Sequence, residues 1–164
     1  MKSILLNGKH GKNKFALVDD DKYPELVKYR WHCSHTGYAR RTVVHTNSDK
    51  SKKYECIFMH KCLLNAPDKK FIDHKNRNTL DNRIENLRIC TPQENSRNRA
   101  VSIVNPSGYK GVFYRKDRNI YYSMIQINGK QKYLGYFKKA IRAAKAYNDA
   151  AIKYYKEFAF LNII

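Results

Sequence analysis

The chain has 164 residues, of which 33 are lysine or arginine and 14 are aspartate or glutamate, giving a formal net charge of +19 at pH 7. That length suits one domain or two small ones, and a hydrophobic content of 42% is enough for compact cores. Such an excess of positive charge favours a polyanionic partner, with nucleic acid as the first expectation. No apolar run approaches the ~20 residues that cross a bilayer, and the N-terminal apolar run is too short for a secretion signal. We therefore expect an intracellular, cytoplasmic protein without a membrane partner, and no protein partner is evident.

Residues 1–57 are expected to form an α+β lead-in. Apolar and β-branched runs predict strands over 15–18, 38–45 and 54–59, and an acidic turn precedes a predicted short helix over 25–29. The four cysteines stand alone, without a C-x-x-C pair, which disfavours a structural zinc and predicts buried free thiols. They are Cys33, Cys56, Cys62 and Cys90.

The pattern that carries chemistry lies within residues 58–100. Residues 71–72 and 87–90 predict two strands separated by a polar loop. Residues 91–94, Thr-Pro-Gln-Glu, predict a helix start, with threonine as N-cap, proline at the first position and glutamate closing a capping box. The expected order of strand, loop, strand and helix allows three polar side chains to converge, those of Asp73, His74 and Asn95. Because neighbours on a regular strand face opposite sides, Asp73 and His74 need a bend to do so.

These residue types suit phosphodiester hydrolysis. An imidazole titrates near neutral pH and can take a proton from water. One carboxylate and one amide oxygen suit a hard ion such as Mg²⁺ or Mn²⁺ better than zinc. Other polar residues nearby are expected to have structural rather than chemical roles. His60 is expected to start a helix or lie in the core, with a supporting role at the site as the lesser alternative, and Asn76, Asn78 and Asn82 are expected to form turns.

The spacing of Asp73-His74, Asn86 and Asn95 resembles the motif of the HNH endonuclease family over about residues 58–99. That family has the ββα-metal fold, so the resemblance implies a nuclease core over residues 58–100. It also implies that His74 is the general base and that Asp73 and Asn95 hold one divalent ion at the scissile phosphate. Asn86 would brace the loop and orient His74. The last motif position is asparagine rather than histidine, which favours an oxygen-ligated metal.

Residues 101–106 are expected to be a linker, because the surrounding segment is rich in turn formers and lacks periodicity. After it, residues 107–164 predict a three-stranded antiparallel sheet packed on one helix, with strands over 110–116, 121–127 and 131–136 and a helix over 138–156. The Asn-Gly pair at 128–129 is a strong hairpin signal. Residues 101–164 hold 12 basic and 3 acidic residues, a net +9, so this shorter segment is the more densely positive.

Residues 107–162 resemble the Apetala-two/ethylene-response-factor DNA-binding domain. The resemblance rests on four segments: residues 109–112, Tyr-Lys-Gly-Val; residues 133–137, Tyr-Leu-Gly-Tyr-Phe; residues 143–147, Ala-Ala-x-Ala-Tyr; and the closing Ala-Phe-Leu-Asn of residues 159–162. It implies a sheet that lies in the DNA major groove and contacts it through Lys110, Phe113, Arg115, Met124, Gln126, Gln131 and Tyr133. The clustered charges of the strands and turns suit phosphate contacts, and they are Arg115, Lys116, Arg118, Lys130 and Lys132.

Together the two segments indicate a DNA endonuclease of homing type, from a phage or other mobile element, that cuts double-stranded DNA with one metal ion. Two alternatives remain at this stage. One is a non-catalytic, DNA-binding transcriptional regulator that uses the nuclease fold as a scaffold. The other is a structure-specific or RNA-directed nuclease, which a major-groove sheet disfavours because A-form RNA hides its major groove.

Overall fold

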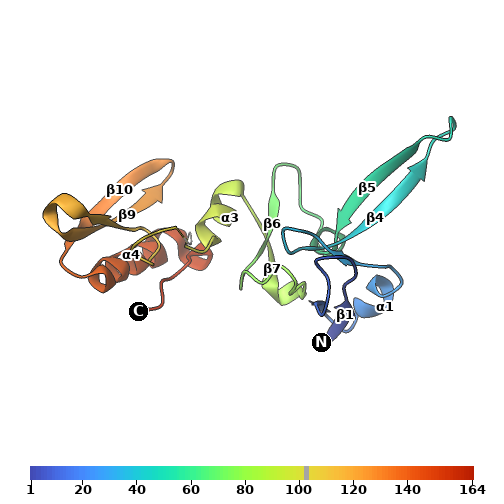
Figure 1. The fold of residues 1–164 in the computed structure, drawn as a ribbon, viewed down its shortest axis with the longest axis horizontal. Coiled ribbons are helices and arrows are strands. Elements are labelled where there is room, and N and C mark those ends of the chain that lie inside the picture. Colours follow the sequence, from blue (N-terminus) through green and yellow to red (C-terminus); the bar gives the residue numbers. More distant parts are fainter. Residues whose placement is uncertain (102–103) are drawn as a thin grey trace. The chain divides into compact units, whose positions relative to one another are not determined.

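The computed structural model describes residues 1–101 and 104–164 and divides the chain into two compact units, Met1–Pro92 and Gln93–Ile164 (Figure 1). Residues 102 and 103 of the predicted linker lie outside the described residues. The chain contains both helices and strands, and the strands form several small sheets, which is compatible with the predicted α+β class. Among the described helices, none combines the length and apolar character that a membrane crossing requires.

The first unit contains three small antiparallel sheets and two short helices. The helices are α1 (Tyr23–Leu26) and α2 (Met59–Leu63). The sheets are formed by β1 (Lys2–Leu5) with β2 (Phe15–Val18), by β3 (His32–Cys33), β4 (Ala39–Thr46) and β5 (Lys52–Phe58), and by β6 (Phe71–His74) with β7 (Leu87–Cys90).

The predicted strands of the lead-in are present with small shifts at their ends, whereas β1 and β3 were not predicted. The predicted helix over 25–29 lies earlier in the chain, because Pro24 occupies the first turn of α1 and starts the helix there. The two missed strands are short and give little alternation to read, and β3 has only two residues.

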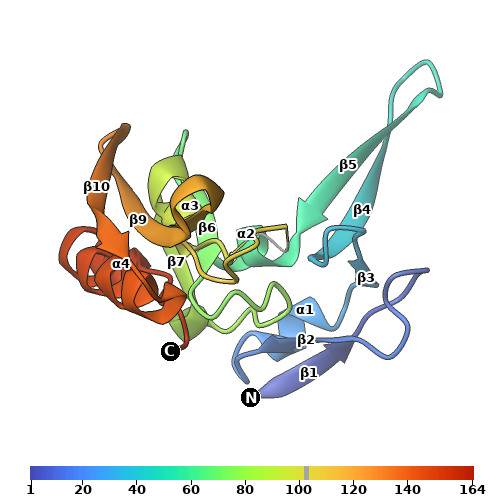
Figure 2. The ribbon, with the colours of Figure 1, turned by 60° about the vertical axis from the view of Figure 1, so that its left-hand side comes forward.

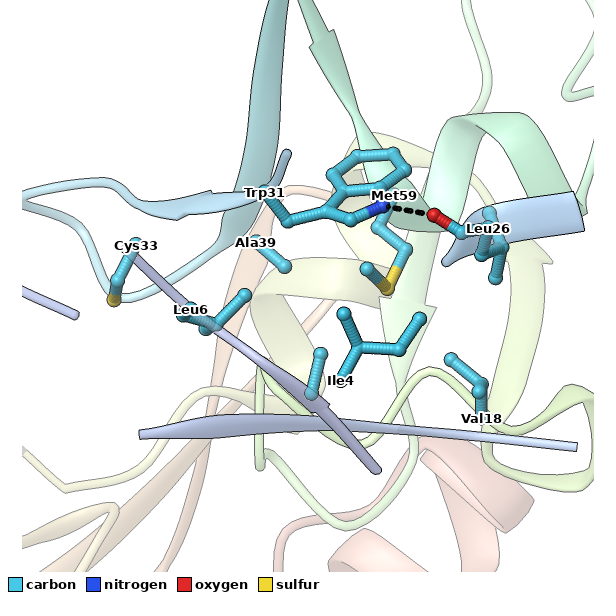
Figure 3. Close-up of a cluster of buried hydrophobic side chains, with 9 residues drawn as sticks. Ile4, Leu6, Val18, Leu26, Trp31, Cys33, Ala39 and Met59 are labelled. Carbon is cyan, nitrogen blue, oxygen red and sulfur yellow. Dashed lines mark hydrogen bonds between the residues drawn. The ribbon is translucent and has the colours of Figure 1, made fainter. Parts of the chain in front are cut away.

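One hydrophobic cluster holds the first unit together (Figure 3). Trp31 and Met59 are fully buried at its centre, and the Trp31 Nε1 atom donates a hydrogen bond of 2.7 Å to the Leu26 carbonyl. The other buried members come from β1, β2, β3, β4 and the loop after β1, and they are Ile4, Leu6, Ala16, Val18, Cys33 and Ala39. The core therefore lies within the predicted lead-in and reaches the start of α2.

The loop between β6 and β7 is fastened to the lead-in by backbone hydrogen bonds. Leu17 on β2 donates its N–H to the Leu80 carbonyl and accepts one from the N–H of Asn82, each at 2.8 Å. The Thr79 hydroxyl donates to the Gly37 carbonyl, also at 2.8 Å. Residues 1–57 and the motif strands thus belong to the same compact unit.

The second unit contains α3 (Pro92–Asn98) apart from its first residue, a sheet in the order β10-β9-β8 and the long helix α4 (Ala140–Tyr155). Its strands are β8 (Val112–Arg115), β9 (Ile120–Ile127) and β10 (Lys130–Phe137). The sheet and helix after residue 107 agree with the predicted elements. The compact division falls after Pro92, so α3 lies in the second unit, although its residues were assigned to the nuclease core from the sequence.

The hairpin between β9 and β10 turns at Asn128 and Gly129, whose φ angles of 48° and 80° fit the turn that an Asn-Gly pair favours. One face of β9 packs under α4, as predicted. Ser123 and Ile125 are buried there, and Ile127 packs against the same cluster. Small alanines on α4 bring the helix close to the sheet, namely Ala143, Ala144, Ala150 and Ala151.

Gly111 is needed for this packing. Its φ is +72°, and a Cβ atom built on it would lie 2.0 Å from Cδ2 of the Tyr147 ring. Any side chain at this position would therefore displace the buried tyrosine of α4.

The prediction of buried thiols is wrong for two of the four cysteines. Cys33 and Cys90 are buried, but Cys56 and Cys62 are exposed. Cys56 lies on a part of β5 that no core covers, and Cys62 lies off the side of α2 that buries Met59 and His60.

Candidate active site

Asp73 and His74 form the end of β6, where pairing with β7 sets Asp73 directly opposite Arg88. The Nε and Nη2 atoms of Arg88 donate to Oδ2 of Asp73 at 2.8 and 2.7 Å. Both side chains are almost withdrawn from solvent, with exposed fractions of 11% for Arg88 and 7% for Asp73. A carboxylate whose charge is compensated by a guanidinium therefore stands immediately before His74 in the chain.

The His74 ring is held by a buried amide. Its Nε2 atom lies 3.3 Å from Oδ1 of Asn82, whose own Nδ2 atom donates to the Leu80 carbonyl at 3.3 Å. Since the amide oxygen faces the ring, Nε2 carries the proton and the basic lone pair of the neutral ring is on Nδ1. Burial lowers the pKa of His74, against the opposing effects of Asn82 and the charges of Asp73 and Asp81. The ring is thus neutral at pH 7, the state that a general base requires.

Two rings contact His74, and a third packs behind them. Tyr38 and His60 have their ring centres 5.8 and 5.4 Å from that of His74, and Phe58 stacks on His60 at 5.5 Å. His60 follows the first residue of α2 and is buried, which confirms the expected helix-start and core position. Its contact with His74 also brings it to the candidate site. We call Tyr38, Phe58, His60 and His74 the ring cluster.

His60 should make the first unit sensitive to acid. Burial, followed by the charges of His74 and Lys61, lowers the pKa of His60 to about 4 from the ordinary 6.5. Its Nδ1 atom is buried without a hydrogen-bond partner among the described residues. Because the unfolded chain takes up the proton first, stability is complete above pH 6.5 and is lost as the pH falls toward 4. The loss should approach about 1.4 kcal/mol per pH unit in this window, or about 2 kcal/mol by pH 5.

Chemical denaturation at pH 7 and pH 5 tests this expectation. The free energy of unfolding should fall less between these pH values in His60→Phe than in the unsubstituted protein. His35→Phe is the matched control, because His35 is exposed in the same unit. An equal fall in all three proteins would show that His60 does not carry the effect.

The loop after His74 is fixed by a buried polar network centred on Asp81. Nε and Nη2 of Arg83 donate to the two carboxylate oxygens at 2.8 and 2.7 Å, and Asn76 Nδ2 donates at 2.8 Å. Asn86 joins this network through its amide, which accepts from the Asn76 N–H at 3.0 Å and donates to the Asp81 carbonyl at 2.7 Å. The hydrogen bonds to Arg83 hold the pKa of Asp81 below its usual range, so the network is charged at neutral pH.

The asparagines of this loop divide into two groups. Asn76 and Asn78 accept backbone N–H groups two residues ahead, at 2.9 and 3.1 Å, as expected of turn formers. Asn82 does more than form a turn, because it is fully buried and touches His74. The Asn86 amide is hydrogen-bonded within the loop and Asn82 contacts the imidazole, so the orienting role of Asn86 stays a prediction.

Asn95 lies on α3, in the second unit, whereas Asp73 lies in the first. Its role as a metal ligand therefore stays a prediction. Over residues 1–101 and 104–164, no group of three or more His, Cys, Asp or Glu side chains could hold a metal ion. A metal at Asp73 would thus draw on amide and water oxygens, and this donor set fits a hard divalent ion.

The face of the second sheet that points away from α4 carries most of the predicted DNA contacts. Val112, Ser123 and Ile125 are buried toward α4, so their strand neighbours face outward. We call this side the outer face, and it holds Phe113, Arg115, Met124, Gln126, Gln131 and Tyr133. On it Phe113 stacks on Tyr122 at 5.2 Å and Tyr122 on Tyr133 at 6.4 Å. Lys116 and Arg118 lie in the turn that follows β8.

The side chains of two predicted DNA contacts, Lys110 and Lys132, do not lie on the outer face. The Nζ atom of Lys110 donates to the carbonyls of Arg97 and Arg99 at 2.7 and 2.6 Å, at the C-terminal end of α3. A lysine there satisfies carbonyls that the helix leaves unpaired. Lys132 lies between two outer-face residues, so strand alternation turns it toward α4, where it donates to the Tyr154 hydroxyl at 2.8 Å. The expectation that Lys110 faces outward is therefore wrong, and Lys132 is not on the outer face.

Comparison with known proteins identifies the motif that contains Asp73 and His74. The family model for HNH endonucleases matches residues 65–97, which include Asp73, His74, Asn86 and Asn95. The chain is 32% identical over 156 residues to an uncharacterised HNH endonuclease of Acanthamoeba polyphaga mimivirus, covering 94% of this chain and 78% of that protein. It is 38% identical over 61 residues to protein 3.8 of Escherichia phage T7, covering 37% of this chain and 50% of that protein. No solved structure matches. The chain belongs to the HNH endonuclease family.

Proposed function

We propose that the protein is a homing-type endonuclease that hydrolyses phosphodiester bonds in duplex DNA with one divalent ion. The observation that carries this proposal is the state of His74. Its ring is neutral, its tautomer is set by Asn82, and it follows directly after a buried carboxylate. Membership of a nuclease family that acts on DNA supports the same reaction.

In this mechanism Nδ1 of His74 accepts a proton from the attacking water, and the Asn82 contact keeps the ring in the productive orientation. The predicted metal ligands are Asp73 and Asn95. A bound Mg²⁺ or Mn²⁺ would supply charge stabilisation at the phosphate and the leaving oxygen. Arg88 positions the Asp73 carboxylate, and Asn86 holds the loop on which Asn82 stands.

We further propose that the second unit holds the enzyme on DNA through its outer face. Its aromatic and amide side chains are suited to base edges and thymine methyl groups, and the charges after β8 are suited to phosphates. The resemblance to the Apetala-two/ethylene-response-factor domain supports a major-groove position. Few arginines stand on the outer face, so we expect weaker guanine readout than in that family.

Cleavage should require a divalent ion. Incubating the protein with supercoiled plasmid is expected to give nicked or linear DNA with Mg²⁺ or Mn²⁺ and uncut plasmid in EDTA. Asp73→Asn keeps the shape of the side chain but removes its charge, so it should need much more metal for the same rate. Asp21→Asn, which removes an exposed carboxylate of the same unit, serves as the control for the loss of one negative charge.

Two outcomes would contradict the proposal. Full cleavage in EDTA would show that the reaction does not require a divalent ion. Tight duplex binding without cleavage under any metal would favour the alternative, a DNA-binding transcriptional regulator that keeps the nuclease fold as a scaffold.

A further inference from the structure

Strands β4 and β5 form a two-stranded ribbon that extends away from the core of the first unit, as both ribbon views show (Figure 1, Figure 2). No residue from 42 to 56 is buried. Val44 and Tyr54, which are directly opposite each other, are 49% and 67% exposed. Beyond its base, where β3 pairs with β4, the ribbon thus has two exposed faces that a partner could cover.

The two faces of the ribbon differ in charge. Residues that pair across the strands share a face, and one face carries no acidic residue. We call it the front face, and it consists of Arg40, Thr42, Val44, Thr46, Lys52, Tyr54, Cys56 and Phe58. The opposite face carries Glu55, whose Oε2 atom is hydrogen-bonded to Nε2 of His45 at 2.9 Å. Only the front face therefore combines cations with exposed apolar groups and lacks negative charge.

The front face also leads to the candidate active site. At the base of the ribbon Arg40 is paired with Phe58, and Phe58 stacks on His60 of the ring cluster. His60 in turn contacts His74. The front face is therefore connected to the candidate active site by a continuous series of ring contacts.

We propose that the front face of the β4–β5 ribbon binds a groove of the duplex beside the bond to be cut. This rests on the proposed nuclease function and assigns a role to residues that the motif does not cover. The major groove accepts a two-stranded ribbon, and seven paired positions at about 3.3 Å each span roughly seven base pairs. Arg40 and Lys52 would meet phosphates, while Val44 and Tyr54 would contact bases or sugars.

The exposed thiol of Cys56 gives a direct test with the unsubstituted protein. Cys56 lies on the front face, whereas Cys62, also exposed, lies on α2. Alkylation would be followed by mass spectrometry with and without a mixed-sequence duplex, in EDTA so that no cleavage occurs. DNA should slow modification of Cys56 about ten-fold or more and leave that of Cys62 nearly unchanged. Equal protection of both thiols, or protection of neither, would overturn the proposal.

Neighbouring lysines provide matched variants. Lys52 points to the front face and Lys53 to the opposite one, so Lys52→Ala and Lys53→Ala remove the same charge one residue apart. Fluorescence anisotropy with the same duplex should show weaker binding and a salt slope lower by about 0.9 for Lys52→Ala only. If both variants lose affinity equally, diffuse charge explains binding. If Tyr54→Ala changes the oligomeric state in sedimentation but not DNA affinity, the face binds a second copy of the chain.

The experiments can contradict the proposed role of the ribbon and the proposed nuclease function independently. The alkylation and anisotropy experiments are both carried out in EDTA, and plasmid cleavage is measured separately with Mg²⁺. A protein that protects Cys56 on DNA but never cleaves would contradict the nuclease proposal and leave the ribbon's role intact. A protein that cleaves while Cys56 stays reactive on DNA would do the reverse.

Discussion

Replacing His74 with alanine is expected to lower the rate of plasmid cleavage by about 10²- to 10⁴-fold, the usual contribution of a general base. The neutral imidazole is the proposed acceptor of the proton from water, and an alanine side chain cannot accept it. Duplex affinity should stay close to that of the unsubstituted protein, because His74 is almost fully buried and adds no charge at pH 7. Single-turnover cleavage and anisotropy measure the two quantities separately.

His35→Ala is the control for this substitution, since it removes an exposed histidine from the same unit. Asn82→Ala should give an intermediate loss, because the ring keeps its position in the cluster but loses the contact that sets its tautomer. Near-normal cleavage by His74→Ala at neutral pH would remove this residue from the mechanism.

Replacing Arg115, Lys116 and Arg118 together with alanine is expected to weaken duplex binding by about 10²-fold or more at low salt. These side chains lie at the end of β8 and in the turn after it. If each meets one phosphate, the slope of log K against log salt should fall by up to about 2.7, at about 0.9 per contact. Cleavage of DNA that is already bound should change little, because none of these three side chains is among the proposed reacting groups, and His74 and Asp73 lie in the other unit.

A second triple variant supplies the matched control. Arg142, Lys145 and Lys153 are exposed on α4, which covers the opposite side of the same sheet. Their replacement by alanine removes the same number of charges from the same unit. Equal losses of affinity and slope in the two variants would show that total charge, rather than the outer face, holds the DNA.

Local chain signals determined much of this protein before any packing was known. Pro92 and the polar residues around it end β7 and begin α3, because a proline fits the first helical position. The Asn-Gly pair at 128–129 requires a tight hairpin, and the alternation along β9 separates Ser123 and Ile125 from Met124 and Gln126. The spacing of Asp73-His74, Asn86 and Asn95 was also sufficient to identify the family.

The surroundings of the reacting group depended on tertiary structure. Tyr38, His60 and Asn82 reach His74 from segments up to 36 positions away, and their contacts follow from how β4, α2 and the loop pack around the Trp31 core. Arg88 meets Asp73 only because of the register between β6 and β7, which strand propensity does not specify. Lys110 binds carbonyls at the end of α3, and the ribbon lacks a cover on either face. Residue type and spacing determine what a side chain can do, but its partners are set by long-range packing.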